Sequence, residues 1–318
     1  MLSLNDVETA AGIVHAAMPP TAQYAWPLLA KRAGCEVWVK HENHTPTGAF
    51  KVRGGLVYMD RLKRASSQPK GIISATRGNH GQSIALAAAR NGIAATIVVP
   101  EGNSVEKNAA MRAFGAELVE AGHDFDAAKE VAQRLAGERG LSMVPSFHRD
   151  LVAGVASYAL ELFRAAPALD TVYVPIGLGS GICGTIAVRD ALGLKTKVVG
   201  VVSTEAPAYA LSFAAGKVVP TNSADTMADG MAVRGPDAEA LDVILKGADR
   251  IVQVSDAEIG AAMRAYYEDT HQLAEGAGAA ALAALLQERD RFAGKRVGVV
   301  LSGGNIDRPV YLRTLADD

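Results

Sequence analysis

The fold is decided by one stretch of sequence, Thr171-Val172-Tyr173-Val174-Pro175-Ile176-Gly177-Leu178-Gly179-Ser180-Gly181-Ile182-Cys183-Gly184. Its first five residues are β-branched, aromatic or otherwise apolar, which predicts a buried strand. Residues 181–192 then carry a helical pattern, and the glycines between the two segments permit a tight turn. A strand, a glycine turn and a helix in this order form one unit of a parallel sheet, so we predict an α/β protein.

The same rhythm of short apolar runs and longer helical patterns continues along the 318 residues, a length that favours two lobes. Strands are predicted at residues 36–40, 71–74, 95–99, 171–175, 197–202, 250–254 and 296–301. Helices are predicted at residues 79–90, 105–114, 125–135, 181–192, 257–267 and 277–287. The start of the helix at 257 is marked by the capping-box spacing of Ser255 and Glu258.

The composition predicts a globular protein of the cytoplasm that binds neither nucleic acid nor membrane. The chain is 49% hydrophobic and 21% charged, and its net charge of -2 gives no attraction to polyanions. Cys35 and Cys183 lack the spacing of a disulfide framework or a zinc cluster, which favours a reducing compartment. The N-terminus has no signal-peptide pattern, and no apolar run reaches the length of a membrane span.

A candidate catalytic lysine follows the first predicted strand, in Thr47-Gly48-Ala49-Phe50-Lys51-Val52-Arg53. Partial burial between Phe50 and Val52 would lower the pKa of Lys51, and a neutral lysine amine can attack an aldehyde or accept a proton. A solvated lysine at a helix start is the competing interpretation, and it is the better one for an isolated Phe-Lys pair. Lys40 is the nearest rival, but its place in a predicted strand favours an edge or surface role.

Two further segments join strands to helices. Ser74-Ala75-Thr76-Arg77-Gly78-Asn79-His80-Gly81-Gln82-Ser83 gathers hydroxyl, amide and backbone donors at a helix N-terminus, where a carboxylate is favoured. The glycines of residues 177–181 allow successive N–H groups to wrap a phosphate. The same glycine loop could hold a dinucleotide, although the strand at 197–202 ends without an acidic ribose ligand and only Glu205 is close.

A fourth segment, Leu301-Ser302-Gly303-Gly304-Asn305-Ile306-Asp307, puts a hydroxyl at the end of the last predicted strand. The hydroxyl of Ser302 can hydrogen-bond a heteroaromatic nitrogen without adding a formal charge. An ordinary glycine turn is the alternative interpretation.

Together the four segments resemble the tryptophan-synthase-like, or fold-type II, family of pyridoxal-phosphate (PLP) enzymes, in its threonine dehydratase and serine racemase branch. The resemblance covers roughly residues 36–307. It implies two open twisted sheets flanked by helices, with PLP between a large domain of residues 1–59 and 149–318 and a small mobile domain of residues 60–148. It also implies a homodimer.

The resemblance implies a role for each segment. Lys51, beside Phe50, would carry the cofactor as a Schiff base, and Asn79 would contact its phenolic oxygen. The phosphate would lie in the cradle of Gly177, Leu178, Gly179, Ser180 and Gly181, and Ser302 would face the pyridine nitrogen. The substrate would be bound by Thr76, Arg77, Asn79 and His80.

The chain departs from the family pattern at two places that bear on the reaction. Serine racemases have a serine where this chain has Arg77, and an arginine, which stays protonated, is a poor second acid–base group. Relatives that bind a divalent cation often have a glutamate where this chain has Val202, so we predict no metal of that type.

We therefore predict a PLP-dependent ammonia-lyase that removes water from a small L-hydroxy-amino acid, such as threonine or serine, and yields a 2-oxo acid and ammonia. A 3-hydroxyaspartate dehydratase is the main alternative, because Arg77 could bind a second carboxylate, unless its side chain points outward or pairs with a protein acid. An amino-acid racemase is a weaker alternative. A nucleotide-binding protein and a PLP-binding protein without catalysis remain as alternatives from other classes.

Overall fold

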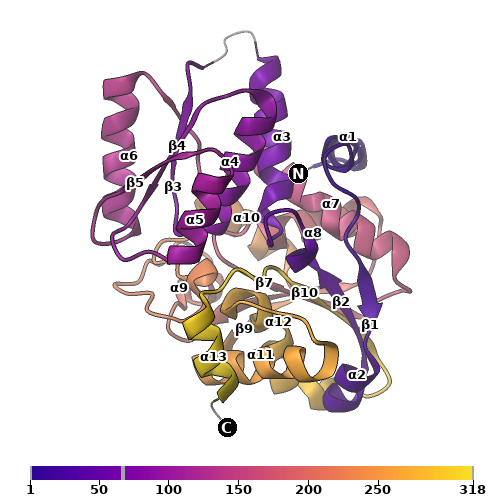
Figure 1. The fold of residues 1–318 in the computed structure, drawn as a ribbon. Coiled ribbons are helices and arrows are strands. Elements are labelled where there is room, and N and C mark those ends of the chain that lie inside the picture. The colour runs from indigo at the N-terminus through magenta and orange to yellow at the C-terminus, as the bar shows by residue number, and fades with distance from the viewer. Residues whose placement is uncertain (1, 66–68, 317–318) are drawn as a thin grey trace.

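Two β-sheets, each flanked by helices, organise the chain in the computed structural model, which describes residues 2–65 and 69–316 (Figure 1). This arrangement confirms the predicted α/β fold with two sheets. The six-stranded sheet has the order β1 (Gln23–Ala25), β2 (Glu36–His41), β10 (Arg296–Leu301), β7 (Thr171–Pro175), β8 (Lys197–Ser203) and β9 (Arg250–Val254). The four-stranded sheet has the order β5 (Glu117–Glu120), β4 (Ala95–Val99), β3 (Ile72–Ala75) and β6 (Ser142–Met143).

All neighbouring strands are parallel except β1, which pairs antiparallel with β2. Every residue of β3, β4 and β7 is buried, as expected where helices cover both faces of a parallel sheet. The seven predicted strands are confirmed to within one residue at each end. Sequence patterns missed β1, β5 and β6, which are two to four residues long and contain no fully buried position.

The helices fill the connections between strands. They are α1 (Leu4–His15), α2 (Pro27–Ala33), α3 (Lys51–Arg64), α4 (Asn79–Asn91), α5 (Val105–Ala113), α6 (Phe125–Arg139), α7 (Arg149–Ala165), α8 (Ser180–Ala191), α9 (Ala208–Ala215), α10 (Ala238–Gly247), α11 (Asp256–Thr270), α12 (Gly276–Gln287) and α13 (Arg308–Ala316). Short 3-10 turns occur at η1 (Glu42–His44), η2 (Asp229–Met231) and η3 (Arg289–Arg291).

Two of the helices show how directly local sequence specifies the fold. The capping box before α11 is present, because Ser255 Oγ accepts from the amide of Glu258 while the Glu258 carboxylate accepts from the amide of Ser255. The alanine-rich α12 is almost wholly buried and packs against four strands of the six-stranded sheet. Among the described residues, no helix has both the length and the apolarity needed to cross a membrane.

The parallel arrangement brings the chemistry-bearing loops to the carboxyl ends of strands in both sheets. The loop of residues 76–78 follows β3, the glycine loop of residues 177–181 follows β7, and Ser302 follows β10. Loops at the carboxyl ends of parallel strands are the usual location of ligand sites in open α/β sheets.

Candidate active site

One cavity of about 1000 Å³ is lined by every residue to which the sequence assigned a role. These residues come from the four motifs, and they are Phe50, Lys51, Thr76, Arg77, Asn79, His80, Gly177, Leu178, Gly179, Ser180, Gly181 and Ser302. Segments up to about 250 residues apart in sequence therefore face a single space.

The lysine is positioned by a turn that is bound to the end of β10. Gly48 adopts a φ of +67°, and a β-carbon there would lie 2.5 Å from Asn305 Oδ1, so both conformation and space require glycine. The amide of Phe50 donates to Ser302 O at 3.0 Å, and the amide of Gly304 donates to Gly48 O at 2.9 Å. These backbone bonds fix the N-terminus of α3, at which Lys51 is the first residue.

The amine of Lys51 lies in surroundings that favour its neutral form. Its Nζ donates to Ser180 Oγ at 3.3 Å and lies 5.1 Å from the centroid of the Phe50 ring. Burial lowers the pKa of Lys51 to about 8 from the usual 10.5, because desolvation disfavours the ammonium ion. The solvated lysine of the competing interpretation is therefore not what the structure contains.

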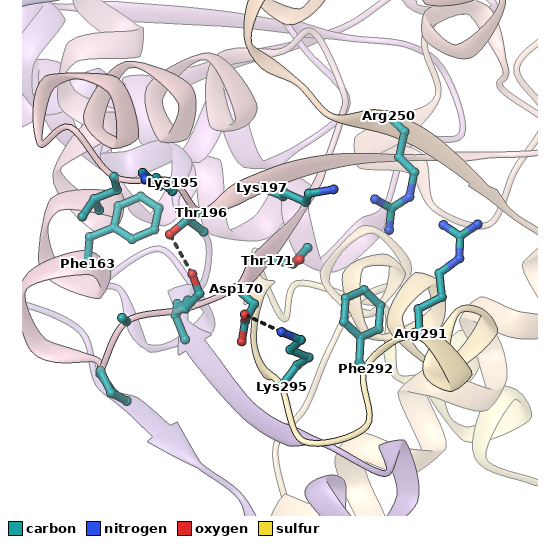
Figure 2. A pocket seen from close by; sticks show the side chains of 14 residues that line it. Phe163, Asp170, Thr171, Lys195, Thr196, Lys197, Arg250, Arg291, Phe292 and Lys295 are labelled. Atoms are coloured by element: carbon teal, nitrogen blue, oxygen red, sulfur yellow. Dashed lines mark hydrogen bonds and ion pairs between the residues drawn. The ribbon is translucent and has the colours of Figure 1, made fainter.

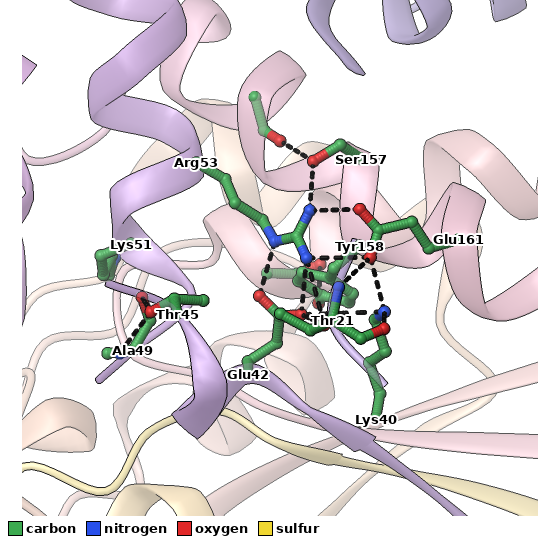
Figure 3. Close-up of polar contacts among 12 residues, drawn as sticks. Thr21, Lys40, Glu42, Thr45, Ala49, Lys51, Arg53, Ser157, Tyr158 and Glu161 are labelled. Carbon is green, nitrogen blue, oxygen red and sulfur yellow. Dashed lines mark hydrogen bonds and ion pairs between the residues drawn. The ribbon is translucent and has the colours of Figure 1, made fainter. Parts of the chain in front are cut away.

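A buried charge cluster anchors the next turn of α3 (Figure 3). The Arg53 guanidinium, which has no exposed surface, donates to both carboxylate oxygens of Glu42 at 2.6 and 2.9 Å and to Glu161 at 2.6 and 2.9 Å. Bidentate pairs of this kind fix orientation as well as charge. The cluster thereby ties α3 to η1 and to α7, and Figure 3 shows the Lys51 side chain apart from it.

Lys40 belongs to this cluster, and the prediction of an edge or surface role for it was wrong. Its side chain is fully buried on β2, an inner strand, and its Nζ donates to Glu161 Oε2 at 2.6 Å and to Thr21 O at 2.7 Å. Sequence could not show that a carboxylate 121 residues away would compensate the charge. With its amine held by these acceptors, Lys40 does not line the cavity of Lys51.

The glycine loop presents unpaired amides to the cavity. Gly179 adopts a φ of +100°, and a β-carbon on Gly177 would lie 2.4 Å from the carbonyl oxygen of Gly230. The amide of Cys183 donates to Gly179 O at 2.9 Å, which leaves the amides of Ser180 and Gly181 without a backbone acceptor among the described residues. A helix start of this form favours an anion.

The loop before α4 contributes a second set of polar groups. The hydroxyl of Thr76 accepts from the amides of Gly78 and Gly81 at 3.0 and 3.3 Å, so it shapes the loop in addition to lining the cavity.

His80 is 9% exposed, and its Nε2 has no hydrogen-bond partner among the described residues. Burial and the nearby Lys51 lower the pKa of His80 to about 3, so the imidazole is neutral near pH 7. Arg77 is exposed at the cavity wall.

Four residues without a role assigned from sequence form a polar network with Asn79, and three of them, Lys107, Asp229 and Glu275, line the cavity. The Asn79 amide contacts Glu275 at 2.6 Å and Asn305 at 2.8 Å, and Lys107 contacts Asp229 at 2.6 Å and Glu275 at 3.3 Å. Burial raises the pKa of Glu275 to about 7, against the opposing effect of Lys107. Asp229, Glu275 and Asn305 each lie beside a glycine in the sequence, whereas Lys107 lies within the predicted helix of residues 105–114. Only their contacts reveal a connected group.

These features fit a phosphorylated aldehyde cofactor. The lysine amine is partly neutral at pH 7, the glycine loop offers anion-binding amides in a space that β-carbons would fill, and His80 has an orphaned buried nitrogen. No group of three or more His, Cys, Asp or Glu side chains that could hold a metal ion occurs within residues 2–65 and 69–316.

A second cavity, of about 530 Å³, lies at the amino ends of β7, β8 and β10 (Figure 2). The first cavity lies at the carboxyl ends of β7 and β10. Its wall is basic, with Lys195, Lys197, Arg250, Arg291 and Lys295. Most of these charges are already compensated, because Lys295 pairs with Asp170, Lys197 with Asp249, and both arginines with Glu288. The first cavity is therefore the stronger candidate for the active site.

Known proteins resemble the chain over nearly its whole length. An L-threonine ammonia-lyase of Thermotoga maritima is 34% identical over 96% of this chain and 76% of that protein. An L-threo-3-hydroxyaspartate ammonia-lyase of Pseudomonas sp is 32% identical over 98% of each chain. The solved structure of maize serine racemase superposes with a TM-score of 0.91 at 25% identity, covering 98% of this chain and 96% of that one.

A family model described as pyridoxal-phosphate dependent enzyme matches the chain and agrees with the chemistry of the first cavity. It covers residues 16–303, which include the lysine turn, the glycine loop and the end of β10. A dinucleotide-binding protein, the competitor raised by the glycine loop alone, is thereby set aside. The family match, together with a cavity suited to pyridoxal phosphate, shows that the chain belongs to the pyridoxal-phosphate dependent enzymes.

Proposed function

We propose that the chain removes water from a small L-hydroxy-amino acid, such as threonine or serine, and that the unsaturated product hydrolyses to a 2-oxo acid and ammonia. One observation carries the proposal. A buried lysine amine with a pKa of about 8 faces the same cavity as an anion-binding glycine loop and a helix N-terminus suited to a carboxylate. The threonine and hydroxyaspartate ammonia-lyases among the relatives support the same reaction type.

Different residues of the chain would bind the cofactor, transfer the proton and bind the substrate. Lys51 would hold the cofactor and, once released from it, take the α-proton of the substrate. The amides of residues 177–181 would bind the phosphate, and the side chain of Asn79 would contact the phenolic oxygen of the cofactor. The loop of Thr76, Asn79 and His80 would bind the substrate carboxylate. When bound, the cofactor supplies a conjugated ring that accepts electrons from the α-carbon.

Two side chains favour elimination over other reactions of the family. Ser302 is buried, and its neutral hydroxyl would give the ring nitrogen no formal charge, which disfavours a long-lived carbanion. Arg77 stays protonated near neutral pH, so it would not replace a second acid–base group of the kind that racemisation needs. We therefore expect racemase activity to be weak or absent.

A second candidate substrate is 3-hydroxyaspartate. Arg77 lies exposed at the cavity wall, where its positive charge helps to lower the pKa of Asp124, which lines the same cavity. Its guanidinium makes no hydrogen bond to Asp124, so it could also bind a second carboxylate of the substrate. The hydroxyaspartate ammonia-lyase among the relatives makes this substrate a direct comparison for threonine and serine.

The proposed architecture has a small domain of residues 60–148 that closes over the cavity and a large domain formed by the rest. Contacts across the two sheets support closure, because Lys107 pairs with Asp229 and Ser104 Oγ donates to Asp307 at 2.6 Å. The family resemblance further supports a homodimer. The two free, buried cysteines, Cys35 and Cys183, suit a reducing compartment such as the cytoplasm.

Purified holoenzyme provides the test. We expect yellow protein that bleaches with borohydride and releases 2-oxo acid and ammonia from at least one of L-threonine, L-serine and the 3-hydroxyaspartate stereoisomers. Lys51→Ala should be colourless and inactive. A wild-type protein that cannot be loaded with PLP would remove the proposal, and a yellow protein that acts on none of these amino acids would make it a non-catalytic cofactor-binding protein.

A further inference from the structure

The orientation of the Asn79 side chain is determined by a chain of hydrogen bonds that starts at a backbone carbonyl. Thr47 O can only accept, so the group 2.7 Å away must be the NH2 of Asn305. The same NH2 lies 2.8 Å from Asn79 and donates to its Oδ1. The Asn79 nitrogen must therefore point the other way, toward Glu275 Oε1 at 2.6 Å. This leaves one hydrogen of Asn79 Nδ2 for an acceptor in the cavity.

Both the main chain and the side chain of Glu275 contact Gly303. Its residue is 2% exposed, its amide donates to Gly303 O at 3.1 Å, and a β-carbon on Gly303 would lie 2.4 Å from its Oε1. The carboxylate is consequently held against the turn that follows Ser302. Movement of the carboxylate toward Gly303 would displace that turn.

The second carboxylate oxygen of Glu275 faces the positive charge of Lys107, which lies on a helix beside the four-stranded sheet. Lys107 on α5 places its Nζ 3.3 Å from Glu275 Oε2 and 2.6 Å from Asp229 Oδ2 on η2. Two ionisable groups act on the Glu275 carboxylate at this position. The positive charge of Lys107 favours its ionised form, and the negative charge of Asp229 opposes it. The charge next to Asn79 is therefore held by contacts between the two sheets.

We propose that Glu275 is a positioning residue, which fixes the amide of Asn79 as a hydrogen-bond donor to the cofactor and sets the electrostatic environment of the cofactor's phenolic oxygen. The proposal rests on the role proposed for Asn79. A flipped amide would set the Asn79 oxygen against the carboxylate and its NH2 against the NH2 of Asn305, so the ionised Glu275 opposes the wrong orientation. Its negative charge also opposes negative charge on a phenolic oxygen bound at Asn79.

The protonation of Glu275 provides a test of this role. The raised pKa of Glu275, about 7, means that its carboxyl is mostly neutral at pH 6 and mostly ionised at pH 8. His80 stays neutral across this window. Any titration of the Lys51 linkage or of the cofactor itself would persist in Glu275→Gln, so comparison with that variant isolates the contribution of Glu275. We therefore expect the visible absorption band of the bound cofactor to change with pH, with a midpoint near 7.

The experiment compares PLP-loaded wild type, Glu275→Gln, Lys107→Met and Glu205→Gln by absorbance between pH 5.5 and 9. Glu275→Gln keeps shape and an acceptor but removes the titrating charge, so the transition near pH 7 should disappear. Lys107→Met removes the cation that favours the carboxylate, so the midpoint should rise by at least one pH unit. Glu205→Gln neutralises an exposed glutamate outside the cavity and should titrate like the wild type.

Borohydride reduction followed by mass spectrometry of the Lys51 peptide distinguishes a failure of the proposed function from a failure of the role of Glu275. A wild type without cofactor on Lys51 would overturn the proposed function itself. Loaded proteins in which wild type and Glu275→Gln have the same pH transition would overturn the role of Glu275 alone. If Glu275→Gln fails to fold, an unshifted midpoint in Lys107→Met overturns that role equally.

Discussion

The amide of Phe50 donates a 3.0 Å hydrogen bond to the carbonyl of Ser302, which joins the residue before the candidate catalytic lysine to the residue after β10. An isolated bridge between Ala49 and Gly303 continues the same contact. The turn that carries the lysine is therefore tied to the six-stranded sheet. Lys51 is also held from the side of α4, because Ser83 Oγ donates to its carbonyl oxygen at 2.6 Å.

Arg53→Met is expected to destabilise the protein by about 3–5 kcal/mol, because Glu42 and Glu161 would lose their shared cation in a buried place. The measurement is the free energy of unfolding from urea denaturation. Arg134→Ala is the matched control, since Arg134 and Glu138 form an exposed pair one helical turn apart that contributes about 0.3–0.5 kcal/mol. Similar losses in both variants would show that the buried cluster is not what anchors α3.

Gly177→Ala is expected to weaken PLP binding by about tenfold, because the new β-carbon would lie 2.4 Å from Gly230 O and move the loop by which we propose the phosphate is held. Titration of apoenzyme with PLP measures the effect. Gly137→Ala, on the exposed face of α6 with nothing within 4 Å, should bind PLP normally and gain about 0.5–1 kcal/mol of stability. Unchanged affinity in Gly177→Ala would argue that the phosphate lies elsewhere.

The attachment of PLP to apoenzyme is expected to accelerate with pH up to about 8 and then level off. Only the neutral amine of Lys51 attacks an aldehyde, and a pKa lowered to about 8 makes this form abundant at a lower pH than in an ordinary lysine. Below pH 8 the rate should rise by about tenfold per pH unit. Stopped-flow absorbance after mixing provides the rates, and free lysine, whose rate should still rise above pH 9, serves as the reference. A midpoint near 10 would contradict a buried amine.

Much of this fold follows from local sequence, because parallel strands covered on both faces leave continuous apolar runs. β4 and β7 illustrate this, since all their residues are buried and both were predicted at their observed bounds. β5 illustrates the limit. Its Glu117 and Glu120 are exposed at an edge strand, so no apolar run distinguishes it from a loop.

The candidate site divides in the same way. Lys51 and the glycine loop could be predicted because each lies in a short contiguous segment whose composition suits one chemical task. Glu275 could not, because its significance comes from Asn79, 196 residues earlier in the chain. Lys40 was misassigned for the same reason: its burial depends on compensation by the distant Glu161. Local composition predicts which groups are available, whereas pairing across the fold decides their protonation.

Arg77→Ala is expected to distinguish the two candidate substrates. If the exposed guanidinium binds a second carboxylate, kcat/KM for 3-hydroxyaspartate should fall by about 10- to 100-fold, the effect of losing a hydrogen-bonded charge, while the values for L-threonine and L-serine should change by less than about threefold. Arg90→Ala, which removes an exposed cation from the far end of α4, controls for overall charge. Equal losses for all three substrates would instead assign Arg77 a role in shaping the loop before α4, and no loss for any would mean that its side chain points away from the bound substrate.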